Sequence, residues 1–289
     1  MTIPITGHTG FLGLLGHPVS HSISPAMHNE SFHQLGLDYV YLCFDVTEEN
    51  LAEAVAGLKI AGIKGFNLTM PCKNKIVELC DQLSPAASLA GAVNTVVVQD
   101  GKLIGHNTDG IGFWQSANEA GFFHQGTTVT LMGMGGASTA IAVQAALDGV
   151  KKLRIFARPT SRFWNRAVQI TERLNQETSC NVQLFDQNDT ETLRNSIASS
   201  HLLVNGTSVG MAPNTDATII SDTSMFHPEL TVADVIYNPR ETLLLKQAKE
   251  AGCKTFNGMY MLLYQGAEAF RLWTGQDMPT ELIKEKFFQ

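Results

Sequence analysis

The sequence predicts an α/β protein with two domains, an N-terminal open α/β domain and a Rossmann-type doubly wound domain. Strand-like and helix-like segments alternate along the whole chain, which favours parallel sheets covered by helices on both faces. A length of 289 residues is sufficient for two domains of ordinary size. A glycine-rich turn at residues 133–138 lies between an apolar strand and an apolar helix, the arrangement that opens a nucleotide-binding sheet.

The first half contains strands, helices and one hairpin. Apolar residues alternate in its strands and recur at helical spacing in its helices. Ser84 and Pro85 are typical of an N-cap and a first helical position, and Asp100-Gly101 is typical of a hairpin turn. The predicted elements are strands 40–46 and 63–69, helices 51–62 and 76–79, a helix from 85, and hairpin strands 93–98 and 103–106.

The second half contains the strands of one sheet and a final long helix. The predicted strands are 128–132, 153–156, 182–185, 202–204 and 230–235, with a helix at 138–147 and further helices between the later strands. Helix 259–274 comes after that sheet should be complete, so it is expected to pack on the first half. We therefore assign residues 1–108 and 258–289 to a substrate domain and 109–257 to a Rossmann domain.

Composition narrows the class of protein. The chain is 44% hydrophobic and 16% charged, with net charge −7 and no basic run, which disfavours a nucleic-acid partner. No apolar run approaches the roughly 20 residues of a membrane helix, and the N-terminus lacks the features of a signal peptide. Five scattered cysteines indicate reduced thiols and a cytoplasmic location. The histidines at 17, 21 and 28 have no carboxylate spaced to complete a metal site, so no metal is expected.

The glycine-rich turn predicts a dinucleotide site. Gly133 permits a tight turn, Gly135 lets a pyrophosphate approach the backbone, and the following helix N-terminus provides N–H donors. Ser138 replaces the third glycine of the usual fingerprint, and a compact strand–helix connection without a ligand is the alternative.

The end of the next strand bears on the choice of cofactor. No acidic residue occurs in 155–162 to hold the ribose 2′-hydroxyl of NAD, while Arg158 and Arg162 suit a 2′-phosphate. This pattern favours NADP over NAD. Two solvated surface arginines are the alternative.

Four polar stretches in the first half do not fit a purely structural role. They are HSISPAMHN (21–29), NLTMPCK (67–73), GAVNT (91–95) and HNTDG (106–110). Together they resemble the motifs of the shikimate dehydrogenase family. The resemblance continues, in order, through NGTSVGM (205–211), DVIYNPRET (234–242) and NGMYMLLYQGAEAF (257–270), and it is greatest for the quinate/shikimate branch.

The resemblance implies a reversible, NADP-linked oxidation of shikimate to 3-dehydroshikimate. Loss of a hydride from a secondary alcohol must be accompanied by loss of the hydroxyl proton to a base. Lys73 and Asp109 match the catalytic pair of the family. Burial would favour the neutral amine of Lys73 and Asp109 would favour its ammonium. A surface lysine beside a helix-capping aspartate is the structural alternative.

The resemblance also implies the contacts to both ligands. Ser24 could alternatively be only an N-cap before Pro25, and the assignment of Gln265 to the substrate site depends on the resemblance alone. The implied substrate-binding residues are Ser22, Ser24, Asn67, Thr69, Asn94, Tyr237 and Gln265, besides Asp109. The implied cofactor-binding residues are Gly133, Met134, Gly135, Gly136, Ala137, Ala157, Arg158, Arg162, Thr207, Val235 and Gly258.

One departure from the family pattern affects the cofactor. Members that prefer NADP tend to carry N-R-T-x-x-R, whereas this chain has Ala157 and Pro159 in place of asparagine and threonine. Dual use of NAD and NADP is therefore one reading. An NAD-linked enzyme acting on quinate and shikimate, and a non-catalytic metabolite-sensing protein, are the rival functions. A homodimer is compatible with the sequence.

Overall fold

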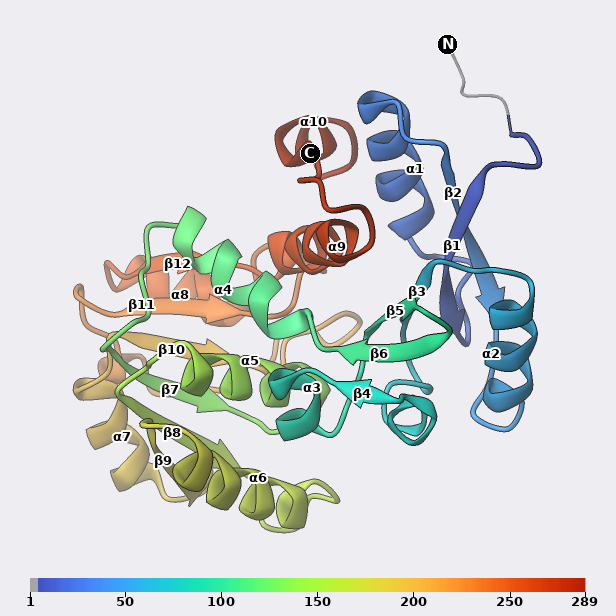
Figure 1. Cartoon of the computed structure of the whole chain (residues 1–289). Coiled ribbons are helices and arrows are strands. Elements are labelled where there is room, and N and C mark those ends of the chain that lie inside the picture. Colours follow the sequence, from blue (N-terminus) through green and yellow to red (C-terminus); the bar gives the residue numbers. More distant parts are fainter. Residues whose placement is uncertain (1–4, 289) are drawn as a thin grey trace. The chain divides into compact units, whose positions relative to one another are not determined.

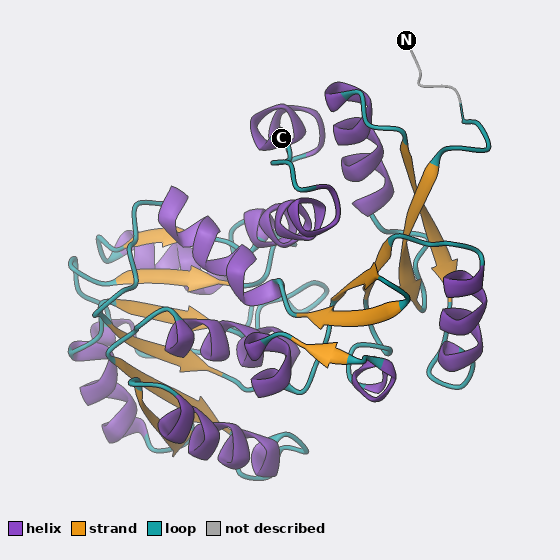
Figure 2. Cartoon of the chain, in the orientation of Figure 1, coloured by secondary structure: helices purple, strands orange, loops and turns teal. Residues whose placement is uncertain are grey.

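The computed structural model describes residues 5–288, and the chain divides into two compact units (Figure 1). Unit 1 comprises Met1–Thr108 and Leu263–Gln289, and unit 2 comprises Asp109–Leu262. The C-terminal boundary falls inside the helix Met259–Thr274, α9. Helices and strands alternate along the chain, so the α/β class predicted from the sequence is confirmed (Figure 2).

Unit 1 is built on one six-stranded sheet, with strand order β2-β1-β3-β5-β6-β4. The strands are β1 (Gly10–Gly16), β2 (Tyr39–Asp45), β3 (Gly65–Leu68), β4 (Gln82–Leu83), β5 (Thr95–Gln99) and β6 (Lys102–His106). The helices are α1 (Ser24–Leu35), α2 (Leu51–Ile60), the 3₁₀ helix η1 (Lys75–Leu79), α3 (Pro85–Ala90), α9 and α10 (Thr280–Phe287).

This sheet is mixed rather than parallel throughout. β1 pairs in parallel with β2 and β3, but β5 is antiparallel to both β3 and β6. The cause is the tight hairpin between β5 and β6, because Asp100 (φ 50°) and Gly101 (φ 72°) are both left-handed. A two-residue turn of this kind can join only antiparallel strands, so the local turn overrides the general expectation of a parallel sheet.

Two further local expectations concern helix ends. Ser84 is the N-cap of α3 as predicted, and its hydroxyl accepts a hydrogen bond from the Ala87 N–H, with Pro85 in the first turn. The helix expected at 76–79 is instead the 3₁₀ helix η1, which is only five residues long. Such a short segment gains little from a regular α-helical ladder, and 3₁₀ turns are common connectors.

The two faces of β3 in unit 1 have different environments. Phe66 and Leu68 belong to a buried apolar cluster that includes Leu51 and Val55 of α2. Asn67, between them in sequence, points to the opposite face because side chains alternate along a strand. On that face the indole N–H of Trp273 in α9 donates to the Val96 carbonyl at 3.0 Å, so the final long helix packs on this sheet.

Unit 2 is a parallel sheet of six strands, ordered β12-β11-β10-β7-β8-β9. The strands are β7 (Thr128–Met132), β8 (Lys152–Ala157), β9 (Asn181–Asp186), β10 (Leu202–Asn205), β11 (Thr231–Asp234) and β12 (Lys254–Phe256). The helices are α4 (Asp109–Glu119), α5 (Gly136–Leu147), α6 (Trp164–Glu177), α7 (Thr190–Ala198), η2 (Thr223–Met225) and α8 (Leu243–Glu250).

The strand order of unit 2 is that of a doubly wound Rossmann sheet. The chain runs from β7 outward to β9, then returns to the middle and runs from β10 outward to β12. The two halves therefore wind in opposite directions, and helices lie on both faces of the sheet (Figure 1). The order reverses between β7 and β10, and ligands of such sheets bind beyond the strand ends at this point.

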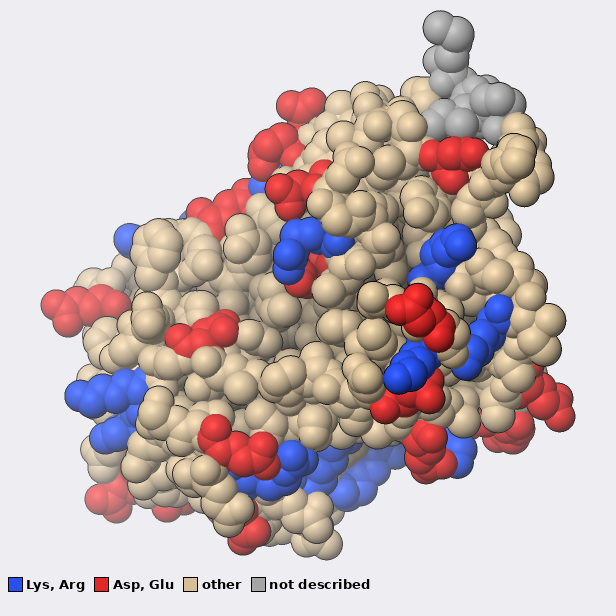
Figure 3. Space-filling view, in the orientation of Figure 1, with Lys and Arg blue, Asp and Glu red and all other residues tan. Residues whose placement is uncertain are grey.

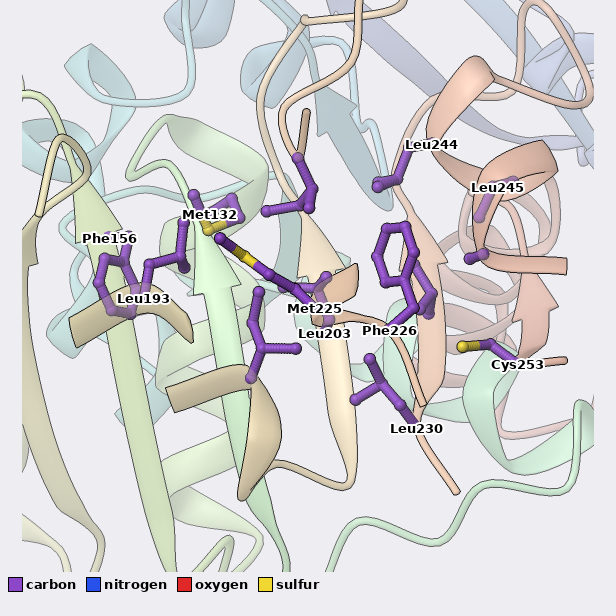
Figure 4. Packing of buried hydrophobic residues seen from close by; sticks show 14 residues of the cluster. Met132, Phe156, Leu193, Leu203, Met225, Phe226, Leu230, Leu244, Leu245 and Cys253 are labelled. Atoms are coloured by element: carbon purple, nitrogen blue, oxygen red, sulfur yellow. The ribbon is translucent and has the colours of Figure 1, made fainter. Parts of the chain in front are cut away.

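One face of the unit 2 sheet carries a large apolar cluster (Figure 4). Met132, Phe156 and Leu203 come from three neighbouring strands, and Leu193 of α7 and Leu244 of α8 pack against the same cluster. Full burial of one such side chain stabilises the fold by about 1.5–3 kcal/mol. The cluster therefore fixes the strands whose ends carry the glycine-rich turn.

Charge and cysteine chemistry add little further constraint. Basic and acidic side chains are interspersed over the face shown in Figure 3. All five cysteines are free thiols. Within residues 5–288, no helix is long and apolar enough to cross a membrane, and no three His, Cys, Asp or Glu residues gather as a metal site would require.

Candidate active site

The polar end of β3 is tied to the start of β5. Asn67 lies opposite Thr95 in the antiparallel pair, and only 5% of Asn67 is exposed. Its amide nitrogen donates to the Asn94 carbonyl at 3.1 Å and to the Thr95 hydroxyl at 2.9 Å. Both donors of this amide are therefore used inside the protein, and its orientation is fixed.

Asn94 connects this strand end to helix α9. Its amide nitrogen donates to the Thr108 hydroxyl at 2.9 Å and to Gln265 Oε1 at 3.3 Å. The Thr108 N–H donates to Asn94 Oδ1 at 2.8 Å, and the Thr108 hydroxyl reaches the Gln265 carbonyl at 3.0 Å. Three sequence motifs, GAVNT, HNTDG and the C-terminal YQGAE, thus meet within unit 1.

Ser22 and Ser24 lie where the chain enters α1. The Ser24 N–H donates to Ser22 Oγ at 3.2 Å, so the proton of the Ser22 hydroxyl remains for another acceptor. The N-cap of α1 is Ile23, and Ser24 already belongs to the helix. The hydroxyl of Ser24 hydrogen-bonds the side chain of Tyr41. The reading of Ser24 as only an N-cap is therefore not supported.

Thr69 and Lys73 follow β3 in a turn that is held by backbone hydrogen bonds. The Thr69 N–H donates to the Leu15 carbonyl at 3.0 Å, and the Val93 N–H donates to the Lys73 carbonyl at 2.8 Å. A Cβ added to Gly16 would lie 2.4 Å from Thr69 Cγ2, so β1 approaches this turn closely. Both Thr69 and Lys73 are half-buried.

Asp109 and Tyr237 belong to unit 2. Asp109 is the first residue of α4 and is half-buried, whereas Tyr237 follows β11 and is 52% exposed. Lys73 belongs to unit 1, and the pairing of Asp109 with Lys73 stays a prediction.

The glycine-rich turn lies at the strand-order reversal of unit 2. Gly133 follows β7 with φ 92°, and a Cβ there would lie 2.6 Å from Thr207 Cγ2 in the loop after β10. A Cβ added to Gly135 or Gly136 would meet nothing within 4 Å. Gly135 is the N-cap of α5 and has no side chain to accept from the first N–H groups of the helix. These features fit the pyrophosphate of a dinucleotide.

Met134, Ala137 and Ser138 complete this turn, and Ser138 stands where the usual fingerprint has its third glycine. Met134 is buried, and Ala137 lies in the first turn of α5. The Ser138 hydroxyl donates to the Gly206 carbonyl at 2.8 Å, and a Cβ on Gly206 would lie 2.1 Å from Ser138 Oγ. The third glycine of the fingerprint normally permits close packing of helix and strand. Here Gly206 in the opposite loop provides that space.

The end of β8 carries the two predicted cofactor arginines. Ala157 is buried as the last residue of β8, while Arg158 and Arg162 are exposed. The Arg162 guanidinium lies 4.7 Å from the centre of the Phe163 ring. Neither arginine forms an ion pair with any residue between 5 and 288, so both positive charges are available to an anionic ligand.

The end of β11 holds the remaining cofactor candidates. A Cβ on Gly258 would lie 1.9 Å from the Val235 carbonyl oxygen, and the Gly258 N–H donates to the Ile236 carbonyl. Next to Val235, the fully buried carboxylate of Asp234 accepts from Thr242 Oγ1 at 2.7 Å and from Asn205 at 3.1 Å. Burial raises the pKa of Asp234. This carboxyl group fixes the strand ends that carry Thr207 and Val235.

Comparison with known proteins gives agreement over the whole chain. The family model described as the shikimate dehydrogenase substrate binding domain matches residues 14–96, and the shikimate 5'-dehydrogenase C-terminal domain matches 258–286. A shikimate dehydrogenase (NADP(+)) of Listeria innocua is 49% identical over 288 residues, covering 100% of this chain and 99% of that protein. The chain belongs to the shikimate dehydrogenase family.

Solved structures of this family and its neighbours share the fold. The crystal structure of shikimate 5-dehydrogenase from Listeria monocytogenes in complex with shikimate and NAD has TM-score 0.96 and 49% identity, covering 99% of this chain and 98% of that one. Quinate dehydrogenase from Corynebacterium glutamicum in complex with NAD has TM-score 0.86 and 31% identity, covering 97% and 99%.

The structure adds residues to the site that the motifs alone do not assign. Thr95 and Thr108 are letters of GAVNT and HNTDG, and their hydroxyls lie inside the network of Asn67, Asn94 and Gln265. Their positions within quoted motifs could have indicated this role. Tyr41 lies in an ordinary alternating strand, and no sequence signal separates it from a core aromatic.

Proposed function

We propose that this member of the shikimate dehydrogenase family is an NADP-linked shikimate dehydrogenase, which reversibly oxidises shikimate to 3-dehydroshikimate. The observation that carries the proposal is the buried hydrogen-bond network of Ser24, Asn67, Asn94 and Gln265. A protein core does not require so many oriented amides and hydroxyls beside one strand end, but recognition of a polyhydroxylated acid does. Full-length identity of 49% to a protein named for this activity supports the same substrate.

Different side chains are assigned to the carboxylate and to the ring hydroxyls of shikimate. We assign Ser22 and Ser24 to the carboxylate: the Ser22 proton is free to meet it, whereas the Ser24 hydroxyl would turn to it from Tyr41. Thr69 and Gln265 can both donate and accept at ring hydroxyls, and Asn94 would exchange one of its bonds to Thr108 and Gln265 for a ring hydroxyl. Asn67 uses its two donors within the protein, so we assign it chiefly to orienting Asn94 and Thr95. Tyr237 is assigned from the family motif and is exposed.

Lys73 is assigned to proton transfer. In the oxidising direction it accepts the proton of the reacting hydroxyl, and in the reducing direction its ammonium returns a proton to the alkoxide oxygen. Asp109 is assigned to holding the ammonium in place. NADP, held by the glycine-rich turn after β7 and by the end of β8, would supply the acceptor for the hydride that leaves the carbinol carbon.

The cofactor is assigned to the turn after β7 and to the end of β8. The open glycines at 135 and 136 leave room for a pyrophosphate, and Arg158 and Arg162 are free to meet a 2′-phosphate. A phosphate beside two guanidinium groups gains charge-assisted hydrogen bonds that NAD lacks. Because Ala157 provides no side-chain hydrogen bond to the ribose, we expect some use of NAD as well.

A cytoplasmic location and a homodimer belong to the same proposal. Five free thiols fit a reducing compartment. Light scattering on the purified protein tests the assembly, since a homodimer has twice the 31.4 kDa mass of one chain.

Two other functions remain as rivals. An NAD-linked enzyme acting on quinate and shikimate fits the likeness to a quinate dehydrogenase solved with NAD. A metabolite-sensing protein on the same fold could bind the acid without converting it.

Replacement of Lys73 separates the enzyme from the sensor. We expect Lys73→Ala to lower kcat for shikimate roughly 10²–10⁴-fold, because general acid–base groups contribute that much, while calorimetry still detects shikimate binding. The control is Lys75→Ala, since Lys75 is exposed in η1 and pairs with Glu78 at 2.7 Å. Full turnover in Lys73→Ala would remove Lys73 from the mechanism. Binding without turnover in the unmodified protein would favour the sensor.

A further inference from the structure

One buried hydroxyl joins two of the predicted substrate-binding residues. Tyr41 lies on β2 with 1% of its surface exposed, and its hydroxyl donates to Asn67 Oδ1 at 2.7 Å. The Ser24 hydroxyl hydrogen-bonds the same phenol oxygen. Ser24 comes from α1 and Asn67 from β3, so the phenol connects elements that are 43 positions apart at these residues (67 − 24).

We propose that Tyr41 is a positioning residue of the substrate site, whose hydroxyl sets the orientation of Ser24 directly and of Asn94 through Asn67 and Thr95. The inference rests on the proposed function, because it assigns Tyr41 a role in binding the hydroxy acid. It adds a residue that lies in none of the family motifs and that is too deeply buried, with 1% of its surface exposed, to be assigned as a ligand contact itself.

The phenol ring is held in one position. It stacks on His28 with the ring centres 4.5 Å apart and 15° between the planes, and Trp273 packs at 6.1 Å. The side chain of Asn29 accepts from the Tyr41 N–H at 2.8 Å and donates to the Tyr41 carbonyl at 2.9 Å. With ring and backbone both fixed, the hydroxyl can serve only Ser24 and Asn67.

The hydrogen bond at Asn67 has consequences along the network. Asn67 donates to the Asn94 carbonyl and to Thr95, and the Thr95 hydroxyl lies 3.1 Å from Asn94 Oδ1. Tyr41 supplies the donor that the Asn67 carbonyl oxygen needs. Without it, a buried carbonyl loses its partner, and such a group tends to reorient towards another donor.

The donor is constant over the working pH range. Burial raises the pKa of Tyr41 well above its usual value, so the phenol keeps its proton wherever the protein is folded. An effect of removing the hydroxyl should therefore be independent of pH.

The test is Tyr41→Phe, which keeps the stacked ring and removes only the hydroxyl. We expect KM for shikimate to rise roughly tenfold, the effect of losing one or two buried hydrogen bonds, with KM for NADP unchanged. Tyr39→Phe is the matched control. Tyr39 lies on the same strand, and its hydroxyl makes no hydrogen bond within the described part of the chain.

A double-mutant cycle distinguishes positioning from general destabilisation. If Tyr41 acts through Ser24, Tyr41→Phe should raise KM for shikimate less in a Ser24→Ala background than in the unmodified protein. Additive effects, or an equal rise in KM for NADP, would contradict the proposal. If Tyr41→Phe unfolds at the assay temperature, Thr95→Val breaks the same chain beyond Asn67 and should raise KM for shikimate selectively.

The outcomes also separate this inference from the proposed function. If the unmodified protein does not oxidise shikimate, the proposed function fails. If it does, and Tyr41→Phe has the same KM for shikimate as Tyr39→Phe, only the positioning role of Tyr41 is wrong.

Discussion

His28 shows how one residue can make stability depend on pH. Its side chain is fully buried, and neither ring nitrogen has a hydrogen-bond partner among residues 5–288. The ring is surrounded by the aromatic side chains of Tyr41, Phe32, Phe270 and Trp273, none of which is charged. Burial lowers the pKa of His28 from 6.5 to about 3. The folded protein therefore holds this imidazole neutral, whereas the unfolded chain protonates it below pH 6.5.

We predict that His28→Phe removes an acid-dependent loss of stability. The stability associated with His28 is fully present above pH 6.5, and falls by about 1.4 kcal/mol per pH unit as the pH drops towards 3. Between pH 6 and 4, the free energy of unfolding of the variant should gain roughly 2–3 kcal/mol relative to the unmodified protein. Urea denaturation at several pH values measures this difference. His33→Gln, an exposed position on the same helix, is the control, and equal pH slopes for His28→Phe and the unmodified protein would contradict the argument.

For individual residues, the sequence predicts which side chains belong to the site better than it predicts their contacts. Asn67, Asn94 and Gln265 are found from motifs, and the structure joins them in one network. The role of Tyr41 could not be predicted, because a buried hydroxyl outside any motif acquires its partners only when distant segments meet. The contact between Ser24 of α1 and Tyr41 of β2 likewise forms only when these two elements pack together.

Among the elements, the turn after β7 depends on a paired choice of small residues. Ser138 occupies the position at which the usual fingerprint has its third glycine. Gly206, in the loop after β10, has no side chain and so leaves room for the Ser138 hydroxyl. The close approach of α5 to this loop therefore depends on both residues together.

We therefore predict that Gly206→Ala is destabilising and that Ser138→Gly rescues it. The added methyl would lie 2.1 Å from Ser138 Oγ and 3.0 Å from its Cβ, and such overpacking typically costs about 1–3 kcal/mol. Thermal denaturation should show a lower Tm for Gly206→Ala, largely restored in the double variant. The control is Gly57→Ala in α2, where a Cβ meets nothing and alanine should stabilise the helix by about 0.5–1 kcal/mol. Failure of the double variant to recover stability would contradict this pairing.

Elements with strong local signals are predicted almost to the residue. The bounds 128–132 and 259–274 are those of β7 and α9, since β7 is a short apolar run that ends at a glycine-rich turn and α9 has apolar residues at helical spacing. Short elements such as β4, with two residues, and β12, with three, give no pattern from sequence. The sheet of unit 1 is mixed because β5 and β6 are joined by a hairpin turn. The alternation of strands and helices along the chain, which predicts parallel sheets, does not take such a turn into account.

For the whole molecule, the order of elements predicts two α/β units, and the order of motifs predicts the family. Both are confirmed. The choice of cofactor is harder to predict, because it depends on two exposed arginines and on an alanine where family members that prefer NADP tend to carry asparagine. Exposed side chains adopt their contacts only when the ligand is present.

The most direct measurement is the initial rate of absorbance change at 340 nm with shikimate or quinate, each with NAD or NADP. We predict that shikimate with NADP gives the highest kcat/KM, with a lower value for shikimate with NAD. A preference for NAD or a dominant quinate rate would mean that Arg158 and Arg162 are solvated surface charges and that the assigned specificity is wrong. The absence of any rate in all four assays would contradict the assignment of this protein as an enzyme.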